Sequence, residues 1–189
     1  MSWALAGRNH LKLEALRRHL IGISPRCRDL KLIIASIKDQ GSLCDMARQA
    51  RVILSTCGPF LRLGTPVVRA CVTEGTHYCD ITGELPWVRQ LMDEFHEEAV
   101  QKKVHIVPSC GFDSIPADLG SWMVAQEAKK TGGARWIHVF SEVDGDVSGG
   151  TVHSLLGMYD SVSPSLIHDP ALLDPPEVGF VFAQIHDTY

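Results

Sequence analysis

Residues 76–108 of the 189-residue chain read THYCDITGELPWVRQLMDEFHEEAVQKKVHIVP. Two short apolar runs, Thr76–Ile81 and Val104–Pro108, flank the longer segment Pro86–Lys102. The apolar residues of this longer segment recur three or four positions apart, which is the spacing of one face of a helix. The stretch therefore predicts strand, helix and strand, the unit from which parallel sheets are built.

The same alternation extends in both directions from this stretch. Thr65 suits an N-cap, Pro66 suits the first helical position and Gly75 suits a C-terminal cap, so we expect a helix between them. Residues 163–176 are expected to form a proline-rich loop. Further strands are predicted at Ser2–Ala6, Leu30–Ser36, Arg51–Cys57 and Trp136–Val143, and further helices at His10–Leu20, Ser42–Ala50, Pro116–Lys129 and Val152–Tyr159. The pattern predicts a doubly wound α/β sheet, which binds ligands at the carboxyl ends of its strands.

The composition is that of a soluble globular chain, with 45% hydrophobic and 21% charged residues. The net charge of −4 argues against a general nucleic-acid binder. No apolar run approaches the roughly 18 residues of a transmembrane helix. The N-terminus lacks the basic region of a signal peptide. We therefore expect an intracellular, cytoplasmic protein.

The six cysteines form no CxxC pair and no tight framework, which favours free thiols in a reducing compartment. The run His77–Asp80 contains metal-ligating residue types. Because side chains alternate between the two faces of a strand, these residues would not converge, and we expect no metal site.

Arg8 and Asn9 follow the first predicted strand. At this place in a dinucleotide-binding fold, an acidic residue accepts from the 2′-hydroxyl of NAD, whereas arginine pairs with the 2′-phosphate of NADP. The planar guanidinium binds phosphate oxygens in pairs. The alternative is an ordinary surface arginine in a strand–helix turn, and spacing alone does not separate the two.

Two further strand ends carry candidate residues. Gly58 would let the backbone approach a ligand, and Pro59 fixes the direction of the chain, although Gly-Pro is also ordinary turn punctuation. Asp80 and Glu84 lie four residues apart and could perform acid–base chemistry. They could equally cap the helix that begins near Pro86.

Residues 109–120, SCGFDSIPADLG, form the densest polar and glycine-rich run of the chain. Asp113 and Ser114 precede Pro116 and could cap the next helix. The run is richer in polar residues than a cap requires, so we interpret it as part of a site.

Five segments together carry a resemblance to a known family. They are residues 6–9 (AGRN), 57–60 (CGPF), 78–84 (YCDITGE), 149–151 (GGT) and above all 111–120 (GFDSIPADLG). Over residues 2–160 the chain resembles the saccharopine dehydrogenase-like oxidoreductases, in the branch that includes bacterial trans-acting enoyl reductases and the eukaryotic saccharopine dehydrogenase-like protein.

The resemblance implies a partial Rossmann domain at residues 1–135 that binds NADP rather than NAD, and the start of a second, substrate-binding α/β domain at residues 136–189. It implies an oxidoreductase of lipid or glycolipid metabolism with a small-molecule or lipid-linked substrate. It also implies association with membranes or lipid droplets. Saccharopine chemistry itself is not implied by this branch.

The chain thus yields a set of candidate site residues but no candidate proton donor, so the catalytic residue is unknown. Arg8 and Asn9 are placed at the 2′-phosphate and adenosine, and the turn after the third predicted strand is placed along the nicotinamide-side ribose. The predicted cofactor-binding residues are Gly7, Arg8, Asn9, Thr56, Cys57, Gly58 and Pro59. The predicted substrate-cleft residues are Asp80, Glu84, Asp113 and Ser114.

The sequence departs from the family pattern because it contains no G-x-x-G-x-x-G phosphate loop and no strand before Ser2. In the strand order 3-2-1-4-5-6, the missing strand would lie between Ser2–Ala6 and Arg51–Cys57. We therefore expect a truncated chain with two open strand edges. Two other hypotheses remain: a catalytically inactive fragment that docks to a partner, including another copy, and an S-adenosylmethionine-binding domain. The last usually has an acid where this chain has Arg8.

Overall fold

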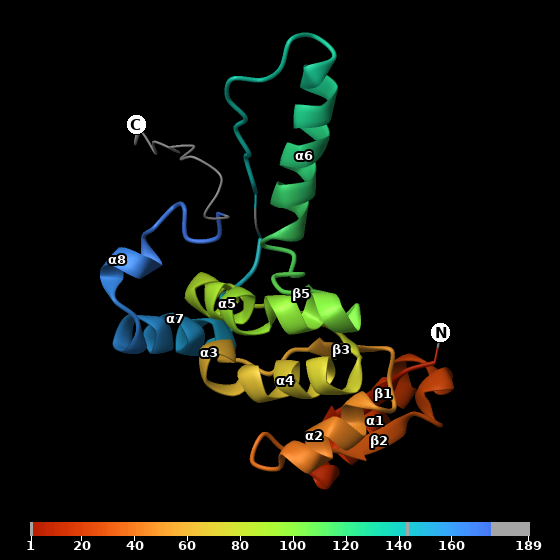
Figure 1. Cartoon of the computed structure of the whole chain (residues 1–189). Coiled ribbons are helices and arrows are strands. Elements are labelled where there is room, and N and C mark those ends of the chain that lie inside the picture. Colours follow the sequence, from red (N-terminus) through yellow and green to blue (C-terminus); the bar gives the residue numbers. More distant parts are fainter. Residues whose placement is uncertain (1, 143, 175–189) are drawn as a thin grey trace. The chain divides into compact units, whose positions relative to one another are not determined.

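The computed structural model describes residues 2–142 and 144–174 (Figure 1). The chain divides into two compact units, and each is described by itself. The first unit contains the residues up to Ile53 together with Thr65–Tyr78 and Glu97–Ile106. The second contains Leu54–Gly64, Cys79–His96 and the residues from Val107 onward.

Strands and helices alternate along the chain, as the sequence predicts. The strands are β1 (Ala4–Gly7), β2 (Lys31–Ile34), β3 (Val52–Ser55), β4 (His77–Asp80) and β5 (Ile106–Val107). The helices are α1 (His10–Ile23), α2 (Gln40–Ala47), α3 (Phe60–Leu63), α4 (Thr65–Glu74), α5 (Leu85–Lys102), α6 (Ile115–Lys129), α7 (Gly149–Ser161) and α8 (Pro164–Ile167), with a 3₁₀ turn at Pro25–Cys27. None of the helices within the described ranges is both long and apolar enough to span a bilayer.

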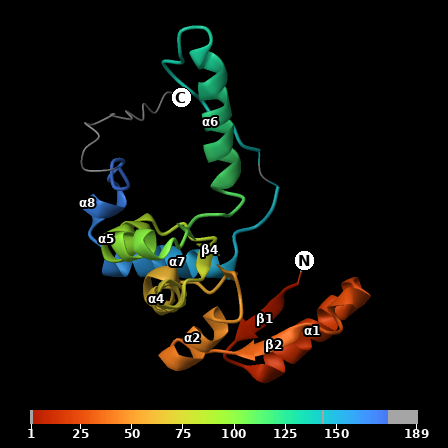
Figure 2. The same ribbon diagram turned by 45° about the vertical axis from the view of Figure 1, so that its right-hand side comes forward.

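In the first unit, β1 and β2 pair in parallel and α1 lies beside them (Figure 2). The register places Ala4 opposite Lys31 and Gly7 opposite Ile34. Beyond the last pair, the Ala35 amide donates to the Gly7 carbonyl at 3.1 Å. The carboxyl ends of both strands therefore lie at the same edge of the sheet.

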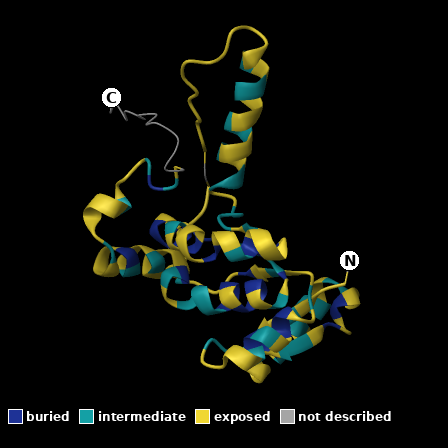
Figure 3. Cartoon of the chain, in the orientation of Figure 1, coloured by how far each residue is buried: buried dark blue, intermediate teal, exposed yellow. Residues whose placement is uncertain are grey.

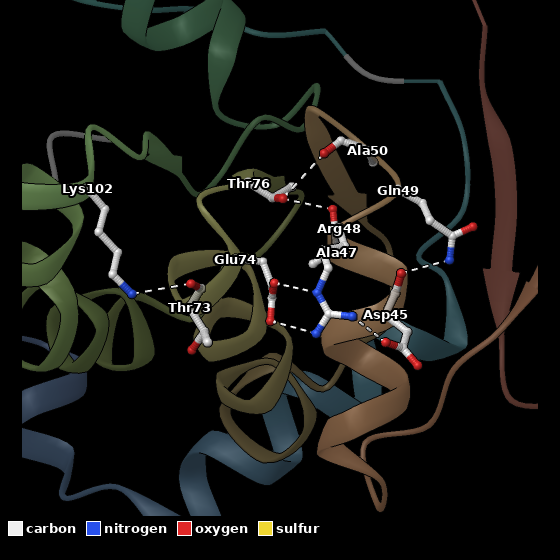
Figure 4. A network of polar contacts seen from close by, with 9 residues as sticks. All are labelled: Asp45, Ala47, Arg48, Gln49, Ala50, Thr73, Glu74, Thr76 and Lys102. Carbon is white, nitrogen blue, oxygen red and sulfur yellow. Dashed lines mark hydrogen bonds and ion pairs between the residues drawn. The ribbon is translucent and has the colours of Figure 1, made fainter.

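Helices α2 and α4 pack together in the same unit. The face of α2 that contains Leu43, Met46 and Ala47 is buried, as is most of α4. A buried threonine joins the end of α4 to α2, because the Thr76 hydroxyl donates to the carbonyls of Ala47 at 2.8 Å and Ala50 at 3.3 Å (Figure 4).

Helix α4 ends as predicted, at a glycine in the left-handed region. Gly75 has a φ of 73°. Its amide donates to the carbonyl of Val72, and the Thr76 amide donates to the carbonyl of Cys71. These two bonds satisfy carbonyls that the helix would otherwise leave free.

The other three strands form a second sheet in the order β3-β4-β5. Helices connect its neighbouring strands, which is the connection that parallel neighbours require. If β1 to β5 are numbered as strands 2 to 6 of the predicted order, every observed pair is a predicted pair. Within the described residues, β1 and β3 are not paired with each other, and the predicted order places another strand between them.

The second unit is built around one end of α5. Trp87 is fully buried and stacks on Phe60 of α3 with 5.5 Å between the ring centroids. Gly64 lies against the same indole: a Cβ built there would be 2.3 Å from Trp87 Cζ2. This close approach requires glycine at position 64.

Helix α6 is the opposite case, since none of its residues is buried (Figure 3). Leu119, Trp122, Met123 and Val124 are each at least 50% exposed. The helix thus forms at the predicted place without contributing to the core of the described structure.

The predicted strand Trp136–Val143 is wrong for residues 136–142, which contain no strand, and residue 143 lies outside the described residues. Trp136 and Phe140 are largely exposed. A strand requires a hydrogen-bonded neighbour, and the described chain provides none here. The apolar and β-branched residues of this segment were therefore not sufficient to form a strand.

Smaller differences occur at element ends. Helix α4 begins at Thr65, which was predicted as its N-cap. The short helix α3, which was not predicted, ends just before it at Leu63. The predicted loop at residues 163–176 contains the short helix α8, and residues 175 and 176 lie outside the described part. All five strands are shorter than predicted.

Candidate functional site

The carboxyl end of β1 presents Arg8 as an exposed side chain. Asn9 follows as the N-cap of α1, and its side-chain oxygen accepts from the amide of Lys12 at 3.0 Å. Within the described chain, Arg8 makes no hydrogen bond or ion pair. Its guanidinium is therefore available to an external anion, whereas the Asn9 side chain already has a structural use.

Gly7 makes only ordinary contacts at this edge. A Cβ built on it would lie 3.4 Å from the side chain of Leu13. This distance is normal van der Waals contact, so packing does not require glycine here. Its place among the cofactor-binding residues stays a prediction.

The turn after β3 contains the second group of predicted cofactor residues. Thr56, Cys57 and Gly58 are exposed. The Cys57 amide donates to the Ser55 hydroxyl at 3.4 Å, and the Gly58–Pro59 peptide bond is cis. The turn therefore presents backbone and small side chains to solvent between β3 and α3.

Asp80 and Glu84 are almost wholly buried, with 0% and 1% exposure. One oxygen of Asp80 accepts from the amides of Thr82 and Ser109, each at 3.0 Å. The two oxygens of Glu84 accept from the amides of Phe60 and Leu61, each at 2.8 Å. Both carboxylates therefore bind backbone amides, and neither faces open solvent.

Asp113 is exposed and Ser114 is half-buried in the turn before α6. Ser114 occupies the N-cap position, but its side chain makes no capping bond. The Asp113 carboxylate lies over Gly111, where a built Cβ would be 2.6 Å from its Oδ1. These two polar side chains are available for a ligand, whereas the carboxylates of Asp80 and Glu84 already bind backbone amides.

The second unit thus brings several candidates together through the segment Asp80–Glu84. The Glu84 carboxylate binds the first two amides of α3, while the Asp80 carboxylate binds the Ser109 amide at 3.0 Å and the Asp80 carbonyl accepts from the Cys110 amide at 2.7 Å. Gly7, Arg8 and Asn9 belong to the first unit.

Sequence reasoning missed two residues that shape these loops. Thr82 is buried, and its hydroxyl accepts from the Glu84 amide at 3.0 Å. Ser109 has a φ of 58°, which is uncommon for a residue with a side chain. A threonine two residues before Glu84 is a known local turn pattern and was a usable signal, whereas no sequence signal indicated the conformation of Ser109.

An ion pair of the first unit, between Arg48 and Glu74, lies away from these strand ends. Arg48 Nε is 2.7 Å from Glu74 Oε2 (Figure 4). The hydrogen bond from Arg48 lowers the pKa of Glu74, and the bonds to Glu74 and Asp45 raise the pKa of Arg48. In the second unit, burial raises the pKa of the Cys79 thiol. These shifts accompany structural contacts and do not by themselves mark a catalytic group.

Comparison with known proteins gives relatives consistent with this arrangement. The model of the saccharopine dehydrogenase NADP-binding domain matches residues 2–107. A trans-acting enoyl reductase of Mycobacterium ulcerans is 42% identical over 129 residues, which cover 68% of this chain and 30% of that protein. A Mycobacterium tuberculosis protein provisionally given the same name is 33% identical, with 93% of this chain and 44% of that protein covered. The chain spans less than half the length of these relatives.

A solved structure supports the fold. The saccharopine dehydrogenase (L-Glu forming) of Saccharomyces cerevisiae superposes with a TM-score of 0.55 at 18% identity, over 69% of this chain and 26% of that one. At this identity the likeness concerns the fold alone, and it confirms the predicted Rossmann-like architecture. Because the family model matches more than half of the 189 residues, this chain belongs to the saccharopine dehydrogenase NADP-binding domain family.

Proposed function

We propose that this chain binds NADP(H) at the carboxyl ends of its strands and forms part of an NADPH-dependent oxidoreductase. In this proposal residues 1–135 bind the cofactor and residues 136–189 begin the substrate domain. The observation that carries it is Arg8, an exposed guanidinium without a protein partner in the described chain, placed directly after β1 of a domain whose family binds NADP.

Arg8 has the chemistry to select NADP over NAD. A 2′-phosphate offers oxygens that a planar guanidinium binds in pairs, and NAD lacks this group. The exposed turn at Thr56–Pro59 is assigned to the nicotinamide-side ribose because backbone can approach a ligand closely there. NADPH, when bound, supplies the hydride, and the protein positions it.

The names of the relatives suggest the reaction class. One of them is named a trans-acting enoyl reductase and the other carries this name provisionally, so we propose reduction of the carbon–carbon double bond of an enoyl substrate. Such substrates are acyl groups, which agrees with a lipid-linked substrate and a place in lipid or glycolipid metabolism. Association with membranes or lipid droplets belongs to the same proposal. The exposed carboxylate of Asp113 and the hydroxyl of Ser114 are the proposed substrate-side groups.

The test is a titration of the chain with NADPH and NADH, followed by its tryptophan fluorescence. The sequence has no glycine-rich phosphate loop, so binding should be weak and the titration should reach millimolar concentrations. Hydrogen bonds to charged groups contribute about 1.5–3 kcal/mol. Arg8→Ala should therefore weaken NADPH binding roughly ten- to a hundredfold and leave NADH binding unchanged.

Arg18→Ala is the matched control, because Arg18 is an exposed arginine on α1. It should leave both affinities unchanged. Equal affinity of the unmodified chain for NADPH and NADH, or NADPH binding that survives Arg8→Asp, would refute the assignment of Arg8. Failure to bind either dinucleotide at millimolar concentration would refute cofactor binding by this chain.

A further inference from the structure

We infer that Glu84 is a positioning residue that fixes the proposed nicotinamide-side turn, Thr56–Pro59, through two backbone hydrogen bonds. The inference rests on the proposed function in one respect, since that function assigns the turn to the cofactor. It changes the predicted role of Glu84 from a substrate-cleft group to a structural anchor of the cofactor site.

The contacts of the Glu84 carboxylate carry this inference. Its two oxygens accept from the amides of Phe60 and Leu61, at 2.8 Å each. These amides are the first two of α3, where a helix provides no internal partner. Each oxygen thus has a backbone donor, and the side chain is 1% exposed. A carboxylate in this setting is not placed to exchange a proton with a substrate.

The turn itself has few other restraints. Among the described residues, its only side-chain-mediated hydrogen bond is the 3.4 Å contact between the Cys57 amide and the Ser55 hydroxyl. The Pro59 carbonyl accepts from the Leu63 amide at 3.0 Å, so the turn is held at one end by β3 and at the other by α3, whose first two amides bind Glu84. Because Phe60 directly follows Pro59, loss of the Glu84 bonds would loosen the end of the turn.

Glu84 is itself firmly held. Its amide donates to the Thr82 hydroxyl at 3.0 Å, and its carbonyl accepts from the amides of Trp87 at 2.9 Å and Val88 at 3.2 Å. The buried Trp87 then stacks on Phe60. Glu84 therefore connects the turn to α5 by hydrogen bonds, while the aromatic pair makes the same connection by packing.

The first measurement is hydrogen–deuterium exchange at the amides of Phe60 and Leu61. Glu84→Gln keeps the shape of the side chain, but its NH₂ group would face one of the two amide donors. Loss of a hydrogen bond to a charged group should accelerate exchange of these amides by about tenfold or more. Glu97→Gln, an exposed change on α5, should leave their exchange unchanged. Unchanged exchange in Glu84→Gln would refute the anchor.

The second measurement is NADPH affinity, determined with the same variants. Glu84→Gln should weaken NADPH and NADH equally, since the turn lies on the nicotinamide side, whereas Arg8→Ala should weaken NADPH alone. Faster exchange with unchanged affinity would refute the positioning role and leave the proposed function standing. Failure of the unmodified chain to bind NADPH would refute the proposed function, and the exchange result would still decide whether Glu84 anchors the turn.

Glu84→Asp provides a second variant if the glutamine variant does not fold. It keeps the charge and shortens the side chain by one methylene group, so it should retain at most one of the two bonds. We expect faster exchange at Phe60 and Leu61 and weaker dinucleotide binding than in the unmodified chain. Values equal to those of the unmodified chain would count against the inference.

Discussion

At the scale of single residues, the contact between Gly64 and Trp87 leads to a stability prediction. A Cβ at position 64 would lie 2.3 Å from Trp87 Cζ2 and 2.8 Å from the Phe60 carbonyl oxygen. Trp87 is fully buried and cannot move freely. We expect Gly64→Ala to lower the free energy of unfolding by about 1–3 kcal/mol, as overpacking does, measured by urea denaturation.

The control for this prediction is Gly157→Ala in α7. No atom lies within 4 Å of a Cβ built there, so helix propensity should make this change neutral or stabilising by up to about 1 kcal/mol. If the two variants had the same free energy of unfolding, the close packing of Gly64 against the indole would be contradicted.

The two buried carboxylates show at the same scale what residue type alone does not predict. Asp80 and Glu84 were predicted as substrate-cleft residues because acidic side chains follow a strand end. In the structure their oxygens bind backbone amides, and those of Glu84 lie 23 and 24 residues away in the sequence. The acidic pattern was visible in the sequence, but its partners were not.

At the scale of elements, the ion pair between Arg48 and Glu74 joins the end of α2 to α4. The hydrogen bond from Arg48 lowers the pKa of Glu74 below the ordinary value of about 4.3. The stabilisation from this shift is therefore present at neutral pH and lost as the pH falls below the ordinary value toward the lowered one. Glu74→Gln should lower stability at pH 7 and have a smaller effect at pH 3, as shown by urea midpoints.

The size of this effect depends on salt, because the Arg48 side chain is 57% exposed and surface pairs are screened. Glu127→Gln is the matched control, since Glu127 pairs with Lys130 within α6 and both side chains are at least 70% exposed. It should change stability little at either pH. An equal loss for Glu74→Gln at pH 3 and pH 7 would contradict the role of the ion pair.

The elements also differ in how much of their formation could be predicted. The apolar spacing of α5 predicted its extent to within one residue, because periodicity is a local property. The strand predicted at Trp136–Val143 is rich in apolar and β-branched residues but is not formed at residues 136–142. A strand forms only when a neighbouring strand pairs with it, and the pattern of apolar residues does not show whether such a neighbour is present.

At the scale of the whole molecule, the four tryptophans report on the core. Trp87 is fully buried, whereas Trp3, Trp122 and Trp136 are 49%, 59% and 64% exposed. Iodide should therefore quench most of the native fluorescence and leave one protected component. Trp87→Phe should remove that component.

Trp122→Phe is the control and should leave the protected component unchanged. A second protected component in the unmodified chain, lost in Trp122→Phe, would show that α6 is covered in solution. Quenching of all four tryptophans in the unmodified chain would contradict the buried position of Trp87.

The sequence by itself determined the α/β alternation and the family, because apolar periodicity and short motifs can be read from neighbouring residues. The pairing order of the strands followed from the fold that these features indicate. It also located Arg8 and the Thr56–Pro59 turn, since these residues directly follow strands. Only the tertiary structure decided that Glu84 binds the start of α3, that Gly64 lies against the indole of Trp87 and that residues 136–142 form no strand. Each of these depends on the distance between residues remote in the chain, and hydrogen bonds and close packing act only at such short distances.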